Sequence, residues 1–370
     1  MISFAGAVRN YAGLNKNVWI IILKYLPETY WKNIICLDKS FQRIFESILL
    51  IKNTSCLSIK ELCINGHVYS VYHYFKTNTF DLNICLYYAC IGGHTQIVNM
   101  MIEKGAKHWN RGLTGACLGG HKDLVNMMIQ KGATHGMNWN KALYEACKGG
   151  HKEIVNLMIE KGANDWNMGL CGACLGGNKE LVNMMIEKGA RNWNSGLIYA
   201  CKGGNKDIVH VVNLMIEKGA IYWNYGLKGA CKGGHKELVN MMIENGANDW
   251  NLGLDYACIG GHEEIVNMMI EKGAKNWNNG LKCACFGGNM EIVNMMIEKG
   301  ANDWNEGLRN ACYGEHIDLV NMMIEKGATN LNEGLYYACE YSEDGNSEII
   351  NLLIKKGANY CLGCNKHKFN

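Results

Sequence analysis

Cysteine is the reactive residue type with the clearest order in this chain, and thiols can serve as nucleophiles, metal ligands or disulfide partners. Ten of the 18 cysteines follow an alanine at intervals of 27 or 30 residues. One more step of 27 residues back from the first of them reaches Cys63, so eleven cysteines share the period. The ten are Cys90, Cys117, Cys147, Cys174, Cys201, Cys231, Cys258, Cys285, Cys312 and Cys339.

These cysteines are predicted to be structural. Equivalent atoms in stacked helix pairs lie roughly 8–10 Å apart, whereas a disulfide needs Cα atoms within about 7 Å of each other. We therefore expect one column of buried, unlinked thiols in a reducing compartment rather than cross-linked or catalytic cysteines.

Two other groups of residues could bind a metal ion. Cys361, Cys364 and His367 could supply three zinc ligands, but no second ligand pair is evident and the segment is terminal. Five histidines share a Gly-Gly-His turn with asparagines in other repeats, which indicates turn hydrogen bonding rather than metal ligation. We predict no metal site and no cofactor. The turn residues are His94, His121, His151, His235 and His262, with Asn178, Asn205 and Asn289.

Enzyme motifs are missing from the sequence. It contains no Walker-type phosphate loop, no Gly-x-Ser-x-Gly and no His-Glu-x-x-His, so we expect no catalysis. A net charge of +3 favours neither nucleic acid nor an anionic membrane. The longest apolar stretch, Val18 to Leu26, is too short to span a membrane. We expect a cytoplasmic monomer.

The thiol period reflects a repeated pair of helices. In one unit, Asn110 is expected to cap a short helix over Gly112 to Leu118, and Gly119-Gly120-His121 to turn the chain. Lys122 to Ile129 has helical apolar spacing, and Lys131-Gly132-Ala133 ends that helix. Such a hairpin buries its apolar face only by stacking. The sequence therefore predicts an all-α solenoid of about eleven 27-residue repeats.

The repeated string Ala-Cys-x-Gly-Gly-His-x-Glu-Ile-Val-x-x-Met-Ile-Glu-x-Gly-Ala resembles the ankyrin repeat from Ser58 to Ala358. Ankyrin repeats run 33 residues with a protruding β-hairpin finger, and the connection here is about six residues shorter. The Thr-Pro-Leu-His start of the first helix is also missing. We expect trimmed fingers and three regions: residues 1–52, an array over 53–358, and a tail over 359–370.

Three units each carry three extra residues. They lie around His135-Gly136-Met137, around His210-Val211-Val212, and within Tyr341 to Asn346. The first and third are expected to bulge from loops at small entropic cost. The second is expected to add nearly one turn to a packed helix.

Residues that recur in every unit are interpreted as framework. Tryptophans open eight units, for which inter-repeat packing is favoured over a ligand surface. They are Trp109, Trp139, Trp166, Trp193, Trp223, Trp250, Trp277 and Trp304. Two asparagine columns, one beginning at Asn99 in the second helices and one at Asn110 in the first, are predicted to form caps and hydrogen-bond ladders.

Residues that vary between units lie on and just before the first helix, where partner specificity can reside. In ankyrin proteins this surface lines a concave groove, and the resemblance implies the same here. The predicted groove residues are Lys148, Tyr199, Lys202, Tyr225, Lys228, Lys232, Asp255, Tyr256, Phe286, Arg309 and Tyr313. Such a groove suits a protein with an acidic patch beside an apolar one. The alternative is an ordinary solvated face.

The first fifty residues do not repeat. Their three expected helices, with Leu26-Pro27 between the first two, resemble an F-box, although the usual Leu-Pro-x-Glu opening is missing. F-boxes bind the adaptor of cullin-RING ubiquitin ligases, and the resemblance implies contacts through six residues. They are Val18, Ile22, Leu26, Pro27, Ile35 and Phe41. A plain helical cap on the array is the alternative.

Two hypotheses for the function follow. The chain either recruits a target protein to a ubiquitin ligase, or is an ankyrin scaffold or sequestering protein without ligase recruitment. An F-box-like start on an ankyrin array resembles proteins of large DNA viruses that infect amoebae, and the Asn-, Lys- and Ile-rich sequence fits an AT-rich gene. In that case the location would be the host cytoplasm.

Overall fold

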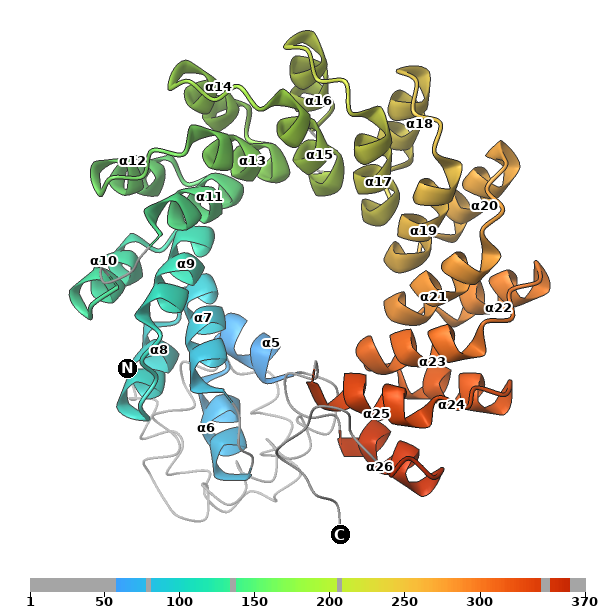
Figure 1. Ribbon diagram of the computed structural model, residues 1–370. Coiled ribbons are helices and arrows are strands. Elements are labelled where there is room, and N and C mark those ends of the chain that lie inside the picture. The colour runs from blue at the N-terminus through green and yellow to red at the C-terminus, as the bar shows by residue number, and fades with distance from the viewer. Residues whose placement is uncertain (1–57, 78–80, 134–137, 205–207, 341–346, 360–370) are drawn as a thin grey trace, which may run out of the picture. The chain divides into compact units, whose positions relative to one another are not determined.

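The computed structural model describes residues 58–359, apart from 78–80, 134–137, 205–207 and 341–346. These described residues form 22 helices and no strand, two helices to each repeat, so they hold eleven repeats (Figure 1). The predicted all-α solenoid with trimmed fingers is confirmed. The F-box-like segment and the Cys361, Cys364 and His367 tail lie outside the described residues.

The chain divides into two compact units, residues 1–146 and 147–370. The boundary falls within α11 (Trp139–Gly149). The first unit also holds α5 (Ile59–Ile64), α6 (Val68–Thr77), α7 (Leu82–Gly92), α8 (Thr95–Glu103), α9 (Trp109–Gly119) and α10 (Lys122–Gln130).

The second unit holds the remaining helices, in which odd numbers mark the first helix of a repeat and even numbers the second. They are α12 (Lys152–Glu160), α13 (Trp166–Gly176), α14 (Lys179–Glu187), α15 (Trp193–Gly203), α16 (Ile208–Glu217), α17 (Trp223–Gly233), α18 (Lys236–Glu244), α19 (Trp250–Gly260), α20 (Glu263–Lys272), α21 (Trp277–Gly287), α22 (Met290–Glu298), α23 (Trp304–Tyr313), α24 (Ile317–Glu325), α25 (Leu331–Glu340) and α26 (Ser347–Lys355).

The repeat of α13 and α14 shows why the sequence folds this way. Asp165 caps α13 by accepting the backbone N–H of Met168 at 3.0 Å. Gly177, with φ +68°, ends the helix in the left-handed conformation that glycine adopts without strain. Asn178 then caps α14 by accepting the N–H of Leu181 at 3.0 Å. Cap and stop signals thus alternate along the chain and set the length of each helix.

The repeats stack mainly through their first helices. In the second unit, α13, α15, α17, α19, α21, α23 and α25 lie side by side in order, and the second helices lie along one side of this row (Figure 1). Each repeat from α7 to α24 buries a leucine, the Ala-Cys pair and an apolar trio of the second helix, such as Leu181, Val182 and Met185. Because these side chains cover one another across neighbouring repeats, a single repeat could not bury them alone.

One local expectation, the N-cap position, is wrong. The first helix of a unit begins at the tryptophan, so Asn110 is its second residue and His108 occupies the N-cap position. The described part of α16 has 10 residues where α14 has 9, and residues 205–207 directly before it are not described, so the turn expected from the insertion around His210 stays a prediction. The other two insertions lie outside the described residues.

Some glycines pack rather than turn: in six repeats a glycine of the first helix lies against a methionine of the second helix. Gly196 is buried within α15, and a Cβ atom there would lie 2.5 Å from Sδ of Met215. A Cβ atom at this position would require the Met215 side chain to shift, so glycine allows the two helices of this repeat to pack closely.

Candidate protein-binding surface

The thiol column is framework, as predicted. All cysteines of the described residues are free, and ten of the eleven in the column are buried, with Cys339 half-buried. Burial raises the pKa of Cys147, Cys201, Cys231 and Cys312 to about 12. Such thiols are protonated at neutral pH and are weak nucleophiles.

Asparagines in the first helices join successive repeats. Oδ1 of Asn167 accepts the backbone N–H groups of Arg191 at 2.8 Å and Asn192 at 2.9 Å in the next repeat. We call this two-bond contact the asparagine clip. It confirms the predicted ladder for this column. The clip recurs at Asn83, Asn194, Asn224, Asn251, Asn278 and Asn305.

The second asparagine column does not form the predicted ladder. The side chains of Asn183, Asn240 and Asn267 project from second helices and are exposed, and they have no hydrogen bond among the described residues. Exposed asparagine inside a helix is less favourable than alanine. This column therefore contributes nothing to the stacking.

The turn histidines join repeats as well. Nε2 of His94, His121 and His316 lies 2.9, 3.0 and 3.1 Å from a carbonyl oxygen of the preceding repeat, belonging to Ile64, Ile91 and Phe286 respectively. This confirms the structural interpretation of the histidines. No cluster of three potential metal ligands occurs among the described residues.

The tryptophans at the helix starts are half-buried. Lys188 lies 5.4 Å from the ring centroid of Trp166, and the Arg191 guanidinium lies 5.9 Å from that of Trp193. These two rings therefore each have a cation near one face.

Asn110 forms no clip among the described residues. Its Oδ1 is buried and has no hydrogen-bond partner in the part of the chain that the structure describes. It lies beside an open cleft of about 370 Å³ lined by Lys107, His108, Trp109, Arg111 and Gly132.

Variable positions form the exposed surface of the first helices, which we call the first-helix face. Lys202 on α15 and Lys232 on α17 are exposed, and neither has an ion pair among the described residues. Lys228 lies over the ring of Tyr256 at 4.3 Å. We call Lys202, Lys228 and Lys232 the basic strip. It provides three positive charges on two adjacent helices.

Asp255 on α19 is less solvated than predicted. Its Oδ2 accepts a hydrogen bond from the amide of Asn279, while Oδ1 is buried without a partner. Burial raises the pKa of Asp255 to about 6, although the Asn279 bond and Lys282 act in the opposite direction. The carboxyl group is therefore partly committed to the contact between α19 and α21.

Aromatic rings lie near one another across α21, α23 and α25. The ring centroids of Phe286 and Tyr313 are 5.2 Å apart, and those of Tyr313 and Tyr337 are 6.0 Å apart. We call these three residues the aromatic row. The Arg309 guanidinium lies 5.6 Å from the Tyr337 centroid.

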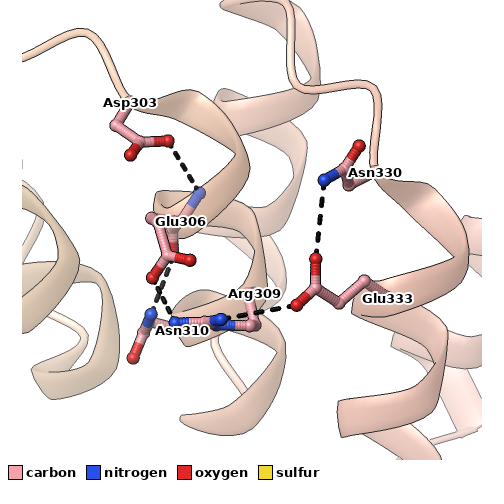
Figure 2. A network of polar contacts seen from close by, with 6 residues as sticks. All are labelled: Asp303, Glu306, Arg309, Asn310, Asn330 and Glu333. Atoms are coloured by element: carbon pink, nitrogen blue, oxygen red, sulfur yellow. Dashed lines mark hydrogen bonds and ion pairs between the residues drawn. The ribbon is translucent and has the colours of Figure 1, made fainter.

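Carboxylates surround Arg309 (Figure 2). Its guanidinium pairs with Glu306 and lies 3.4 Å from Oε1 of Glu333. The N–H of Glu306 is bonded to the cap residue Asp303 at 3.1 Å. Two carboxylates lie beside one guanidinium, so the local net charge here is negative, unlike that of the basic strip. Arg309 therefore lies next to the aromatic row, but its positive charge is neutralised by Glu306 and Glu333.

The predicted groove residues fall into these groups, with exceptions. Lys148 and Tyr199 are half-buried, and Lys148 lies where the two units divide. The prediction missed Tyr337, Glu306 and Glu333. It also missed Ile221 and Tyr222, which are exposed beside Tyr225. Ile221 and Tyr222 could have been found from the sequence, because the other described repeats have a polar pair such as Asn-Asp directly before the tryptophan.

Comparisons with known proteins identify the family. A family model described as ankyrin repeats (3 copies) matches residues 86–169, 113–194 and 227–307, just over half of the chain. The chain belongs to the ankyrin repeat family and is a protein–protein interaction module.

Further comparisons concern individual proteins. No curated protein matches the chain. The crystal structure of the human ASB11 ankyrin repeat domain is similar at 24% identity and a TM-score of 0.30, covering 45% of this chain and 85% of that one. No helix of the described residues is long and apolar enough to cross a membrane.

Proposed function

We propose that the first-helix face of the second unit binds a target protein and that the N-terminal segment recruits it to a ubiquitin ligase. One observation carries the binding part. Residues that recur in all repeats are largely buried or bonded between repeats, while residues that vary form the basic strip and the aromatic row on one face.

The basic strip supports an electrostatic contribution to binding. Lys202 and Lys232 contribute little to stability where they stand, because exposed charges without partners are solvated. A partner with acidic residues would gain attraction and a faster association rate from them. The aromatic row adds rings of the type that dominate binding energy at interfaces.

A charge-reversal experiment tests the binding part. We expect the Lys148→Glu, Lys202→Glu, Lys232→Glu variant to lose most captured protein in quantitative affinity capture from amoebal lysate. Its thermal midpoint should match the parent chain. Lys179→Glu, an exposed lysine at the start of α14, is the control for charge alone. Equal loss of stability and capture would show that these lysines are framework and contradict the proposal.

The recruitment part rests on the resemblance of residues 1–52 to an F-box. The purified ligase adaptor should bind the full chain, and Leu26→Ala with Pro27→Ala should weaken that binding at least tenfold. Adaptor binding that is undetectable, or unaffected by the two substitutions, would leave the alternative of an ankyrin scaffold or sequestering protein. In either case we place the chain in the cytoplasm, and in the host cytoplasm if the gene is viral.

A further inference from the structure

Three exposed apolar residues cluster where α16 leads into α17. Ile221, Tyr222 and Tyr225 are 64%, 49% and 52% exposed. The described residues contain only two other large exposed apolar side chains, Tyr72 and Tyr313. We call Ile221, Tyr222 and Tyr225 the apolar tip.

The residues of the apolar tip differ from those at the same positions of other repeats, and they stabilise the fold less. The two positions before tryptophan are polar at the other described junctions, for example Asn164-Asp165 and Asn248-Asp249. Asp165 and Asp249 cap their helices, whereas Tyr222 occupies the N-cap position of α17 with no side-chain hydrogen bond. Tyrosine here gives up a stabilising cap and exposes a ring to water.

The apolar tip is held in place by its backbone. The N–H groups of Ile221 and Tyr222 both donate to Oδ1 of Asn194, at 2.8 and 3.1 Å. The N–H of Tyr225 donates to the carbonyl of Tyr222 at 3.1 Å, and the two tyrosine rings lie 5.8 Å apart. A surface that is already ordered loses little entropy when it binds a partner.

The apolar tip continues into the basic strip along one side of α17. Tyr225, Lys228 and Lys232 are spaced i, i+3 and i+7, so they share a helix face. At 1.5 Å per residue, about 10 Å separates Tyr225 from Lys232. An extended peptide covers that distance with about three residues. Lys202 on the neighbouring helix α15 widens the positive end.

We propose that the apolar tip and the basic strip together bind an extended segment of a partner protein that carries a large apolar side chain and acidic residues about three positions away. The apolar side chain packs on Tyr222 and Tyr225, and the carboxylates meet Lys228, Lys232 and Lys202. This inference rests on the proposed function and adds the chemistry of the bound segment.

A random dodecapeptide library displayed on phage, selected against the full chain, is the probe. Enriched peptides should carry one large apolar residue and acidic residues at the stated spacing. Their affinity should fall at least tenfold on the Ile221→Asn, Tyr222→Asp, Tyr225→Asn variant. That variant should not melt at a lower temperature, because aspartate restores the N-cap. Substituting the polar preceding junction, Arg191→Asn with Asn192→Asp, should leave affinity unchanged.

Other outcomes overturn the inference in distinguishable ways. Peptide binding that depends on Lys202 and Lys232 but not on the apolar tip would refute this inference and leave the proposed function standing. Failure to enrich acidic apolar peptides, or binding indifferent to both sets of substitutions, would refute both. Self-association lost in the tip variant would assign the patch to a second copy. Protection of Tyr222 from hydroxyl-radical labelling in the free monomer would assign it to another segment of this chain.

Discussion

Single amide side chains fix the position of one repeat against the next. Each asparagine clip satisfies two backbone N–H groups that precede a helix, so one side chain sets both the distance and the register of its neighbour. Burial of apolar side chains supplies most of the attraction between repeats but is not directional. The hydrogen bonds of the clip are directional, so they fix how one repeat is placed on the next.

Removing a clip should weaken the array locally. In Asn251→Ala, the N–H groups of Lys275 and Asn276 lose their acceptor, and we expect a loss of about 1–2 kcal/mol in the free energy of unfolding. Asn267→Ala is the matched control, because Asn267 is exposed on a second helix. The better helix propensity of alanine should raise the free energy of unfolding of this variant by about 0.5 kcal/mol. Urea titration measures both, and equal effects would argue against the clip.

Asp255 should make stability depend on pH. Its pKa of about 6 in the folded chain lies above the ordinary value of 3.8. A raised carboxyl pKa contributes stability below about pH 4 that is lost as the pH rises through 6. Asp255→Asn should therefore raise the urea midpoint relative to the parent chain at pH 7.5 and less so at pH 4. Glu244→Gln, an exposed carboxylate, should show no such difference.

At the scale of elements, the close pairing of the two helices in a repeat depends on a missing side chain. Gly196 meets the sulfur of Met215 where a Cβ atom would overlap it. Helix propensity favours alanine over glycine by about 1 kcal/mol, so glycine persists here for steric reasons.

Overpacking at this contact gives a clear prediction. Gly196→Ala should destabilise the chain by about 1–3 kcal/mol despite its better helix propensity. Shortening the facing side chain in Gly196→Ala with Met215→Ala should cost less than the sum of the two single substitutions, because the added methyl fills part of the space. If the losses of stability of the two single substitutions add up in the double variant, as measured by thermal unfolding, the contact between Gly196 and Met215 does not restrict the packing of the two helices.

At the scale of the whole molecule, the sequence period was enough to predict the helix pairs, the thiol column and the role of the turn histidines. The period could not predict that Asn251 joins two repeats while Asn267 faces solvent, because both asparagines recur with the same regularity. Only the packing of the helices decides which of the two is exposed. The period also misplaced the N-cap, since tryptophan is as compatible with a loop as with a first helical residue. The apolar tip was visible only as a departure from the repeat.

The thiol column should make the whole array sensitive to alkali. Burial raises thiol pKa values to about 12 from 9.0, so these groups contribute stability below pH 9 that is lost as the pH rises toward 12. Each such thiol adds a slope of about 1.4 kcal/mol per pH unit in that range. Unfolding from pH 8 to 10.5 should therefore show a shallower decline for Cys201→Ala with Cys231→Ala. Identical pH slopes would contradict this account.

The asparagine clip also bears on how such a gene can change in length. Asn194 bonds to residues 27 and 28 positions ahead, across an insertion, in the same way that Asn167 bonds to residues 24 and 25 positions ahead. Each of these two clips reaches only the adjacent repeat, and the Asn194 clip forms across extra residues. Unequal recombination between two copies would therefore add or delete whole repeats while leaving the clips of the remaining repeats in place, and with each event the set of side chains presented to partners would change.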